Sequence, residues 1–265
     1  MKTDPTDYSM LDRPEVLMCL FHPRPEWGAG APPEPATDIS IPVESGVAIG
    51  ARFYMAGKES PNILFFHGNG EIVSDYDDLG PMYNRIGINF LAVDYRGYGR
   101  STGTPTVSSM MGDCHVIFDF VAGWLEKNGY SGSLIVMGRS LGSASAIELA
   151  AAYPDRIAGL IVESGFAYAA PLLKLLGVDA HAIGFKEKEG FRNTGKIEVF
   201  SKPTLIIHAA LDHIIPFSDG QALYAASGSE QKHLLKIPGA NHNDIFARGL
   251  SDYLAAVKSL IEKIV

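Results

Sequence analysis

The sequence predicts an α/β fold in which a mostly parallel sheet carries helices on both of its faces. From Asn62 onward, short apolar runs alternate with stretches of helical periodicity, a rhythm typical of a doubly wound sheet. The runs are continuously apolar, as expected of parallel strands that are buried on both faces. They span residues 63–66, 90–93, 134–137, 160–162, 205–207 and 234–237.

Two long stretches between these runs have the spacing of amphipathic helices. Apolar residues return at steps of four and three through residues 110–124, and a similar pattern covers residues 246–260. Ahead of the first run, residues 38–44 and 47–54 alternate in polarity and are joined by Ser45-Gly46. This pattern predicts a β-hairpin that precedes the parallel strands.

Composition and charge exclude several classes of protein. The chain has 265 residues, of which 46% are hydrophobic and 20% charged, so a packed core is expected. A formal net charge of −8 offers no dense positive field to a phosphate backbone, and no nucleic-acid partner is predicted. Two cysteines, Cys19 and Cys114, are too few for a disulfide scaffold, and Cys114 is predicted to be a small buried apolar side chain.

The N-terminal residues do not predict a signal peptide. They are polar and acidic, and the short apolar stretch at residues 16–21 lacks a basic lead and a small-residue cleavage site. No run reaches the ~18 apolar residues that a membrane helix needs. A cytoplasmic protein without a membrane span is therefore expected.

The chain is predicted to consist of an N-terminal arm, residues 1–37, and a single α/β domain, residues 38–265. Residues 28–35 are rich in glycine and proline and predict a loop. Over about residues 164–201 the strand–helix rhythm is interrupted, which indicates a small cap inserted at the active-site edge. Within this insertion, residues 171–185 are predicted to be helical.

The strand at residues 134–137 runs into Gly138-Arg139-Ser140-Leu141-Gly142, followed by a helix that begins with small residues. A serine in a sharp turn between strand and helix is lifted above the carboxyl edge of the sheet, where it can act as a nucleophile. Side chains at Gly138 or Gly142 would collide with neighbouring backbone, so the turn needs glycine at both positions. Ser140 is the predicted nucleophile.

A nucleophilic serine needs a general base, and the base needs a carboxylate that orients it. Asp212 follows the strand at residues 205–207, and His242 follows the last strand in a loop before the final helix. This order of serine, acid and histidine is the one found in sheets of this type. Ser140, Asp212 and His242 are therefore the predicted catalytic residues.

Other residues compete for these roles. Glu163 ends the strand next to the nucleophile strand and is the most serious alternative acid, whereas Asp244 is better explained as the N-cap of the last helix. His213 is predicted to be a surface residue, and His208, at a strand end, a core residue. His181 lies in the insertion, where a role in lining the pocket or a solvent-facing position both fit.

The loop His67-Gly68-Asn69-Gly70 follows the first parallel strand. A tetrahedral intermediate needs two hydrogen-bond donors, and the predicted donors are the backbone N–H groups of Asn69 and Leu141. Gly68 allows the backbone to approach closely, and His67 is predicted to brace the loop. Neither a cofactor nor a metal is predicted, since no zinc-type spacing of ligands is present.

A rival explanation of the same loop is a dinucleotide-binding fingerprint. Gly68 and Gly70 follow a strand, and Asp94 lies at a suitable distance along the chain for a ribose contact. The third glycine of that fingerprint is replaced by Val73, and a histidine stands at the strand exit. A nucleotide-binding oxidoreductase is therefore disfavoured.

Taken together, these segments resemble the α/β-hydrolase superfamily over residues 40–265. The resemblance is carried by His67–Gly70, by Asp94-Tyr95-Arg96-Gly97-Tyr98-Gly99-Arg100-Ser101, by the Ser140 turn, by residues 202–208 and by Asp212 with Pro216. The subgroup that the chain resembles most is that of small-cap, serine aminopeptidase-like and acyl-protein-thioesterase-like hydrolases. The resemblance implies about eight strands and a Ser-His-Asp hydrolase. Arg139 departs from the His or Gln often found before the serine.

The predicted activity is hydrolysis of ester, thioester or amide bonds through an acyl-enzyme on Ser140, with a small-molecule acyl substrate. Alternatives are a non-catalytic binding or scaffold protein with the same fold, and cofactor-free perhydrolysis by the same residues. Small to medium hydrophobic substrates are predicted, because the insertion offers apolar side chains to a pocket. These side chains are Phe166, Leu172, Leu173, Leu175, Leu176 and Phe185.

Overall fold

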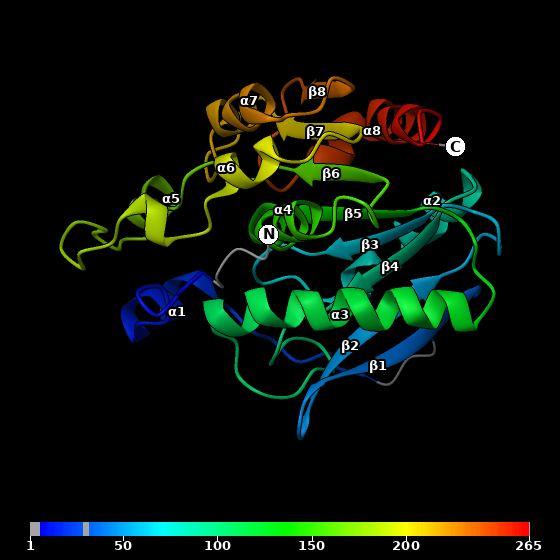
Figure 1. The fold of residues 1–265 in the computed structure, drawn as a ribbon, viewed down its shortest axis with the longest axis horizontal. Coiled ribbons are helices and arrows are strands. Elements are labelled where there is room, and N and C mark those ends of the chain that lie inside the picture. Colours follow the sequence, from blue (N-terminus) through cyan, green and yellow to red (C-terminus); the bar gives the residue numbers. More distant parts are fainter. Residues whose placement is uncertain (1–5, 29–31, 265) are drawn as a thin grey trace.

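The computed structural model describes residues 6–28 and 32–264, and the predicted sheet is present in this part of the chain (Figure 1). Residues 1–5, residues 29–31 of the predicted 28–35 loop, and Val265 lie outside the described residues. The strands are β1 (Ala36–Glu44), β2 (Val47–Tyr54), β3 (Asn62–Phe66), β4 (Asn89–Val93), β5 (Leu134–Arg139), β6 (Gly159–Glu163), β7 (Thr204–Ala209) and β8 (Lys232–Ile237).

Helices and short 3-10 turns connect the strands. The α-helices are α1 (Pro14–Leu20), α2 (Gly80–Arg85), α3 (Val107–Lys127), α4 (Ser143–Ala152), α5 (Ala169–Leu175), α6 (Asn193–Glu198), α7 (Phe217–Ala226) and α8 (Ile245–Ile261). The 3-10 turns are η1 (Val73–Tyr76), η2 (Ser140–Gly142) and η3 (Glu187–Glu189). The helices predicted at residues 110–124 and 246–260 correspond to α3 and α8.

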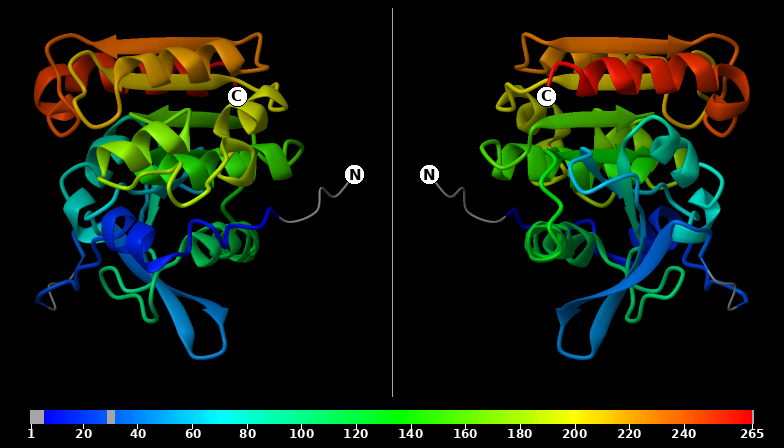
Figure 2. Two further views of the ribbon diagram at one scale, coloured as in Figure 1. Left: turned by 90° about the vertical axis from the view of Figure 1, so that its left-hand side faces the viewer. Right: turned by 90° about the vertical axis from the view of Figure 1, so that its right-hand side faces the viewer.

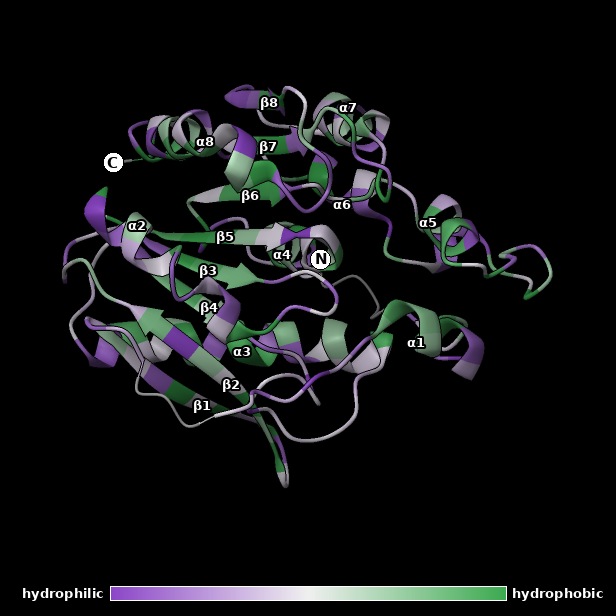
Figure 3. Ribbon diagram, turned by 180° about the vertical axis from the view of Figure 1, so that it is seen from behind, coloured by the Kyte–Doolittle hydropathy of each residue, from purple (hydrophilic) through white to green (hydrophobic). Residues whose placement is uncertain are grey.

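The strands form one eight-stranded sheet in the order β1-β2-β4-β3-β5-β6-β7-β8. The pairs β1–β2 and β2–β4 are antiparallel, and all pairs from β4 to β8 are parallel. Every residue of β3, β4, β6 and β7 is buried, as their continuously apolar runs predict, and Figure 3 shows these central strands as mostly hydrophobic. The expectation of a mostly parallel sheet of about eight strands is confirmed.

Helices cover both faces of the sheet (Figure 2), and the sheet separates the core into two clusters. Helices α2 and α8 pack on one face, over a cluster that includes Phe65, Phe90 and Tyr253. Helices α3, α4 and α7 pack on the other face, where Cys114 is fully buried as predicted. The carboxyl ends of the parallel strands remain open between these two layers, and this edge is where loops can deliver functional side chains.

The described part of the N-terminal arm packs against the α/β domain. Leu11 and Val16 are fully buried in the larger core cluster, and the Arg13 guanidinium donates to the carbonyl of Ile183 at 3.0 Å. Figure 1 shows α1 and α5 on the same side of the molecule, beyond the carboxyl ends of the strands. The arm and the insertion thus both lie at the edge that carries the candidate residues.

The insertion after β6 contains less helix than expected. Residues 171–185 were predicted to be helical, but α5 ends at Leu175, and the following residues form turns. Gly177 has a φ of 85° and donates to the Lys174 carbonyl at 3.1 Å, while Val178 donates to the Leu173 carbonyl at 2.9 Å. These two bonds form a Schellman motif, in which a left-handed glycine closes the helix.

No helix in residues 6–28 and 32–264 is long and apolar enough to cross a membrane. Within the same residues, no group of His, Cys, Asp and Glu side chains is arranged to hold a metal ion.

The glycine that closes α5 provides a test of the helix end. Gly177→Ala places a Cβ on a left-handed residue, and we expect the free energy of unfolding to fall by about 1 kcal/mol. The matched control is Gly112→Ala: this glycine is exposed within α3 and a Cβ there meets nothing within 4 Å. Its replacement should raise the free energy of unfolding by about 0.5–1 kcal/mol. Urea unfolding measures the free energy of unfolding of both variants. Equal changes in the same direction would contradict the assignment of Gly177 as the left-handed residue that ends α5.

Candidate active site

Ser140 stands at the tight turn between β5 and α4. Its φ of 50° lies in the left-handed region, which costs a non-glycine residue roughly 1–2 kcal/mol. A Cβ on Gly138 would lie 2.2 Å from the Gly142 carbonyl oxygen. A Cβ on Gly142 would lie 2.2 Å from the Phe66 carbonyl oxygen. The close packing around the turn therefore requires glycine at both positions, in agreement with the sequence.

The structure brings Ser140, His242 and Asp212 into one hydrogen-bonded chain. Asp212 follows β7 and His242 follows β8, so the parallel strands carry both side chains to the edge where Ser140 lies. The His242 Nε2 atom is 3.0 Å from Ser140 Oγ, and Nδ1 is 2.7 Å from Asp212 Oδ2. All three residues are buried. In this geometry Nδ1–H donates to the carboxylate, and Nε2 is left to accept from the serine hydroxyl.

The carboxylate of Asp212 is held in its ionised form. Burial alone would raise its pKa, but the hydrogen bond with His242 and the charge of that ring more than compensate, and the pKa is lowered. The backbone N–H groups of Ile214 and Ile215 add to this effect, because they donate to Asp212 Oδ1 at 3.0 and 2.8 Å. An ionised carboxylate can orient the imidazole and stabilise its protonated state.

The competing acids lie elsewhere. Glu163 is fully buried, accepts from the Tyr253 hydroxyl at 2.7 Å and lies beside Arg139. Asp244 stands at the N-cap position of α8, as predicted, but its side chain accepts from the Asn241 N–H at 2.6 Å instead of capping the helix. Neither side chain forms a hydrogen bond with His242 in the described part of the structure.

The other histidines take distinct places. His208 is fully buried and its Nε2 is 2.8 Å from the Ile215 carbonyl, and Nε2 also lies 3.7 Å from Asp212. It therefore supports the loop that carries the acid. His213 is exposed, as expected of a surface residue. His181 is exposed and borders a surface groove of about 770 Å³ formed by residues 170–181 of the insertion.

The loop of residues 67–70, here called the 67–70 loop, lies against the nucleophile turn. A Cβ on Gly68 would be 3.4 Å from the Ser140 Cβ, which shows how closely the two segments approach. The backbone N–H groups of Asn69 and Leu141 donate to no acceptor within residues 6–28 and 32–264. Two donors without partners beside a serine are suited to a developing negative charge on oxygen.

His67 is fully buried at the start of this loop. Its Nδ1 atom is 2.7 Å from the Gly68 carbonyl oxygen, and its Nε2 atom lies 3.2 Å from the Asp94 carboxylate. The Tyr95 hydroxyl donates to the His67 carbonyl at 2.7 Å. These contacts join the 67–70 loop to the segment that begins at Asp94.

Arg139 occupies a buried position that the sequence did not explain. Its Nε atom is 2.9 Å from Glu71 and 3.6 Å from Glu163, and Nη2 donates to the His242 carbonyl at 3.1 Å. Burial lowers the pKa of the guanidinium, but the charges of Glu71 and Glu163 raise it more, so that the net pKa is raised. One guanidinium thereby connects the nucleophile strand, the loop after β3 and the turn that carries His242.

Glu71 passes this connection on to the 67–70 loop. Its Oε2 atom accepts from the Gly68 N–H and from the Tyr76 hydroxyl, both at 2.6 Å. Burial opposes the charge of Glu71, but Arg139 and the Tyr76 hydroxyl lower its pKa. Sequence reasoning missed this role; the signal that could have indicated it was a glutamate just after a glycine-rich loop, together with an arginine before the serine.

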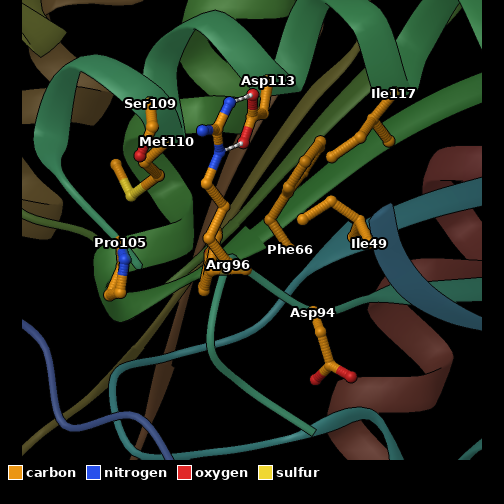
Figure 4. A pocket seen from close by; sticks show the side chains of 10 residues that line it. Ile49, Phe66, Asp94, Arg96, Pro105, Ser109, Met110, Asp113 and Ile117 are labelled. Atoms are coloured by element: carbon orange, nitrogen blue, oxygen red, sulfur yellow. Dashed lines mark hydrogen bonds and ion pairs between the residues drawn. The ribbon is translucent and has the colours of Figure 1, made fainter. Parts of the chain in front are cut away.

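The segment from Asp94 to Ser101 is anchored to α3. Figure 4 shows the Arg96 side chain directed at Asp113, with two hydrogen bonds of 2.7 and 2.8 Å, while Asp94 points away from that pair. The cavity among these side chains has a volume of about 10 Å³, too small for a substrate. This segment therefore has a supporting role. Its Tyr98 hydroxyl donates to Asn69 Oδ1 in the 67–70 loop at 2.7 Å.

A larger cavity, of about 300 Å³, flanks the site between α2 and α8. Arg139 and Asn243 line it, and these are the chain neighbours of Ser140 and His242. Its apolar wall is formed by Leu79, Met82, Phe246 and Leu250. The six apolar residues that the sequence offered from the insertion do not line this cavity. Phe166, Leu173 and Phe185 are buried in the core, Leu172 and Leu176 are partly buried against it, and Leu175 is 53% exposed.

The buried guanidinium should be indispensable for folding stability. Arg139→Met leaves Glu71 and Glu163 without their common partner, and we expect the free energy of unfolding to fall by about 3–5 kcal/mol. Arg248→Met is the matched control, since its side chain is 59% exposed and pairs with Asp244 at 3.3 Å. The control should cost below about 1 kcal/mol. Similar costs for the two variants, measured by urea unfolding, would show that the buried network contributes little.

Comparisons with known proteins agree with this architecture. The model of a family described as "Serine aminopeptidase, S33" matches residues 57–182. Alpha/beta hydrolase domain-containing protein 17B of Homo sapiens is 33% identical over 220 residues, which cover 77% of this chain and 68% of that protein. Alpha/beta hydrolase domain-containing protein 17C of Xenopus tropicalis is 31% identical over 231 residues, with coverage of 82% and 67%.

Solved structures share the fold at lower identity. The Pyrococcus furiosus esterase Pf2001 aligns with a TM-score of 0.72 and 18% identity over 91% of this chain and 98% of its own. Est1E from Butyrivibrio proteoclasticus, with ferulic acid bound, aligns with a TM-score of 0.70 and 20% identity over 85% and 99%. The chain belongs to the α/β-hydrolase family and is an enzyme of the hydrolase class.

Proposed function

We propose that this hydrolase cleaves carboxylic esters or thioesters of small to medium hydrophobic substrates, with Ser140 as the nucleophile. The observation that carries the proposal is the chain of hydrogen bonds from Ser140 through His242 to Asp212, at 3.0 and 2.7 Å. Amide bonds are a further candidate, since the same groups can attack any acyl carbon. The residues of the insertion, about 164–201, are proposed to form a small cap beside this site.

In the first half of the reaction, Ser140 Oγ attacks the carbonyl carbon and its proton passes to His242 Nε2. Asp212 holds the ring with Nδ1–H toward the carboxylate and stabilises the imidazolium that forms. The carbonyl oxygen becomes an oxyanion and accepts hydrogen bonds from the N–H groups of Asn69 and Leu141. When the tetrahedral intermediate collapses, His242 returns the proton to the leaving oxygen or sulfur, and the acyl group stays on Ser140.

In the second half, a water molecule replaces the leaving group. His242 takes a proton from this water, whose oxygen attacks the acyl carbon, and the same two N–H groups bind the second oxyanion. Collapse of the intermediate releases the carboxylic acid, and the proton on His242 returns to Ser140 Oγ. Each bond that is broken is matched by one that is formed, and no group outside the chain, the substrate and water takes part.

The cavity between α2 and α8 supports a hydrophobic substrate. Its volume of about 300 Å³ is at the lower end of small-molecule sites, roughly 300–1,000 Å³. Its wall combines the four apolar side chains named above with charged ones, and Asn243 connects it in sequence to the proposed general base, His242. The charged side chains are Glu71, Asp75, Asp78 and Arg139. We therefore infer that an apolar part of the substrate, of modest length, occupies this cavity during the reaction.

The direct test is covalent labelling of the intact protein with a fluorophosphonate. We expect a single adduct on the Ser140 peptide, which is absent from the Ser140→Ala variant, because an activated serine and an oxyanion site are both needed for reaction. The same substitution should lower kcat on p-nitrophenyl butyrate by more than roughly 10³-fold. Ser131→Ala, at an exposed position, is the matched control and should label as the wild type does.

Absence of an adduct on the folded wild-type protein would remove the proposal. The non-catalytic binding or scaffold function would then be the better explanation of the fold. Labelling of Ser140 without hydrolysis of any ester or thioester in a chain-length series, but with release of amines, would instead identify an amidase.

The position of the hydrophobic subsite is tested by filling the cavity. Leu250→Trp should lower kcat/KM on p-nitrophenyl octanoate by roughly tenfold, about the effect of two methylene groups left in water, and change the acetate ester little. Leu175→Trp, on the exposed face of α5, is the control and should leave both substrates unchanged. The reverse result would place the subsite in the insertion.

A further inference from the structure

Two residues of the N-terminal arm form hydrogen bonds with the 67–70 loop. The His22 backbone N–H donates to Asn69 Oδ1 at 2.8 Å, and Asn69 Nδ2 is 2.7 Å from His22 Nδ1. Because Asn69 Nδ2 can only donate, the histidine nitrogen must be the acceptor. The Arg24 Nε atom donates to the Gly70 carbonyl at 2.7 Å, and its guanidinium also pairs with Asp75. The arm therefore contacts the last two residues of the loop.

The arm is itself held firmly in this place. Phe21, directly before His22, is 5% exposed and belongs to the larger core cluster. After it, the Gly99 N–H donates to the Arg24 carbonyl at 2.9 Å, and the Glu26 N–H donates to the Gly99 carbonyl at 3.1 Å. Residues 22–26, here called the arm segment, are thus fixed by a buried aromatic side chain at one end and by backbone pairing at the other.

The side chain of Asn69 is occupied by partners on two sides. Its Oδ1 atom accepts from the His22 N–H and from the Tyr98 hydroxyl, the latter at 2.7 Å. The residues on either side are glycines, and Gly70 has a φ of 76° with nothing near the position of a Cβ. A residue between two glycines has little local restraint on its backbone. The peptide plane that carries the Asn69 N–H is held on one side through the Gly68 carbonyl, which contacts His67 Nδ1 at 2.7 Å and accepts from the Glu71 N–H at 3.3 Å. On the other side it is held by the partners of the Asn69 side chain, so the direction of the N–H depends on both.

We infer that the arm segment positions the Asn69 backbone N–H to receive the oxyanion, so that His22 and Arg24 are positioning residues for catalysis. This inference rests on the proposed function of the site. Loss of one oxyanion donor lowers kcat by roughly 10²–10³-fold, and a donor that is misdirected but still present should cost less. For arm variants we therefore expect kcat to fall by roughly 10–100-fold, with KM within about threefold of the wild-type value.

The variants remove each contact without removing the arm. His22→Phe keeps a ring but offers no acceptor to Asn69, Arg24→Met removes the donor to Gly70, and the double variant combines both. His22→Asn retains an acceptor oxygen near the position of Nδ1 and should restore most of the activity. Arg13→Met is the matched control in the same arm, since Arg13 contacts the Ile183 carbonyl of the insertion and not the 67–70 loop.

The readout separates an oxyanion defect from general loosening. Each variant is assayed on p-nitrophenyl butyrate and on the corresponding thionoester, in which sulfur replaces the carbonyl oxygen and accepts hydrogen bonds weakly. We expect the arm variants to lose activity on the oxygen ester and much less on the thionoester. Urea unfolding identifies any variant that is not folded, and the single variants then stand in for the double one.

Four outcomes overturn the inference. Wild-type kcat in the double variant would show that the arm has no effect on the loop. An equal loss on both substrates, or failure of His22→Asn to restore activity, would show a general structural role instead. If wild-type Ser140 were not labelled by fluorophosphonate, the proposed function would fail and this inference with it. If the wild type is labelled and arm variants behave as wild type, only the inference about the arm is lost.

Discussion

The buried guanidinium of Arg139 joins parts of the chain that are distant in sequence. It contacts Glu71 after the 67–70 loop, Glu163 at the end of β6 and the carbonyl oxygen of His242. Taking a charged group out of water costs several kcal/mol unless opposite charges and hydrogen bonds compensate. If these partners moved away, Arg139 would be left as a buried charge without compensation, which is strongly unfavourable. The network therefore fixes the loops around the serine relative to each other.

Around this network, the sheet determines where the candidate catalytic side chains lie. The strands β5, β6, β7 and β8 are parallel neighbours, and the loops after β5, β7 and β8 carry Ser140, Asp212 and His242. All three loops therefore leave from one edge, and short side chains suffice to form the hydrogen-bonded chain. The strained φ of Ser140 is maintained because neighbouring backbone packs directly against the two glycines of the turn.

Structural features that depend on residues close together in the sequence could be predicted. The continuous apolar runs located the parallel strands, because a strand covered on both faces has no polar side to interrupt the pattern. The expectation of burial on both faces was wrong for residues 234–237, since β8 lies at the edge of the sheet and only Ile237 in it is buried. The glycines at 138 and 142 predicted the turn at Ser140, because the close approach of neighbouring backbone excludes a side chain at both positions. The order of serine, acid and histidine along the chain then indicated the other candidate residues. The helix at 171–185 was overestimated, because Gly177 ends it by a left-handed residue inside an otherwise helical pattern.

Contacts between distant segments could not be predicted. His22 and Asn69 are 47 positions apart, and Arg139 and His242 are 103 apart. Such contacts produce neither periodicity nor composition bias, and they depend on how the finished sheet brings loops together. Arg139 was noted only as a departure from the usual residue before the serine, and the arm only as residues 1–37 ahead of the α/β domain. Sequence patterns thus predicted the candidate reacting groups, while the groups that hold them could be found only in the structure.

The two buried carboxylates near His242 show why one of them is suited to act as its partner. Burial disfavours the ionised form of both carboxyl groups. Asp212, however, receives hydrogen bonds from His242 and from two backbone N–H groups, and its pKa is lowered. Burial raises the pKa of Glu163 despite the nearby Arg139 and the Tyr253 hydroxyl. When their environments shift the pKa values of two carboxyl groups in opposite directions, the two groups are suited to different roles. Asp212, whose pKa is lowered, is the carboxylate that contacts His242 and can stabilise an imidazolium, whereas Glu163 lies beside Arg139.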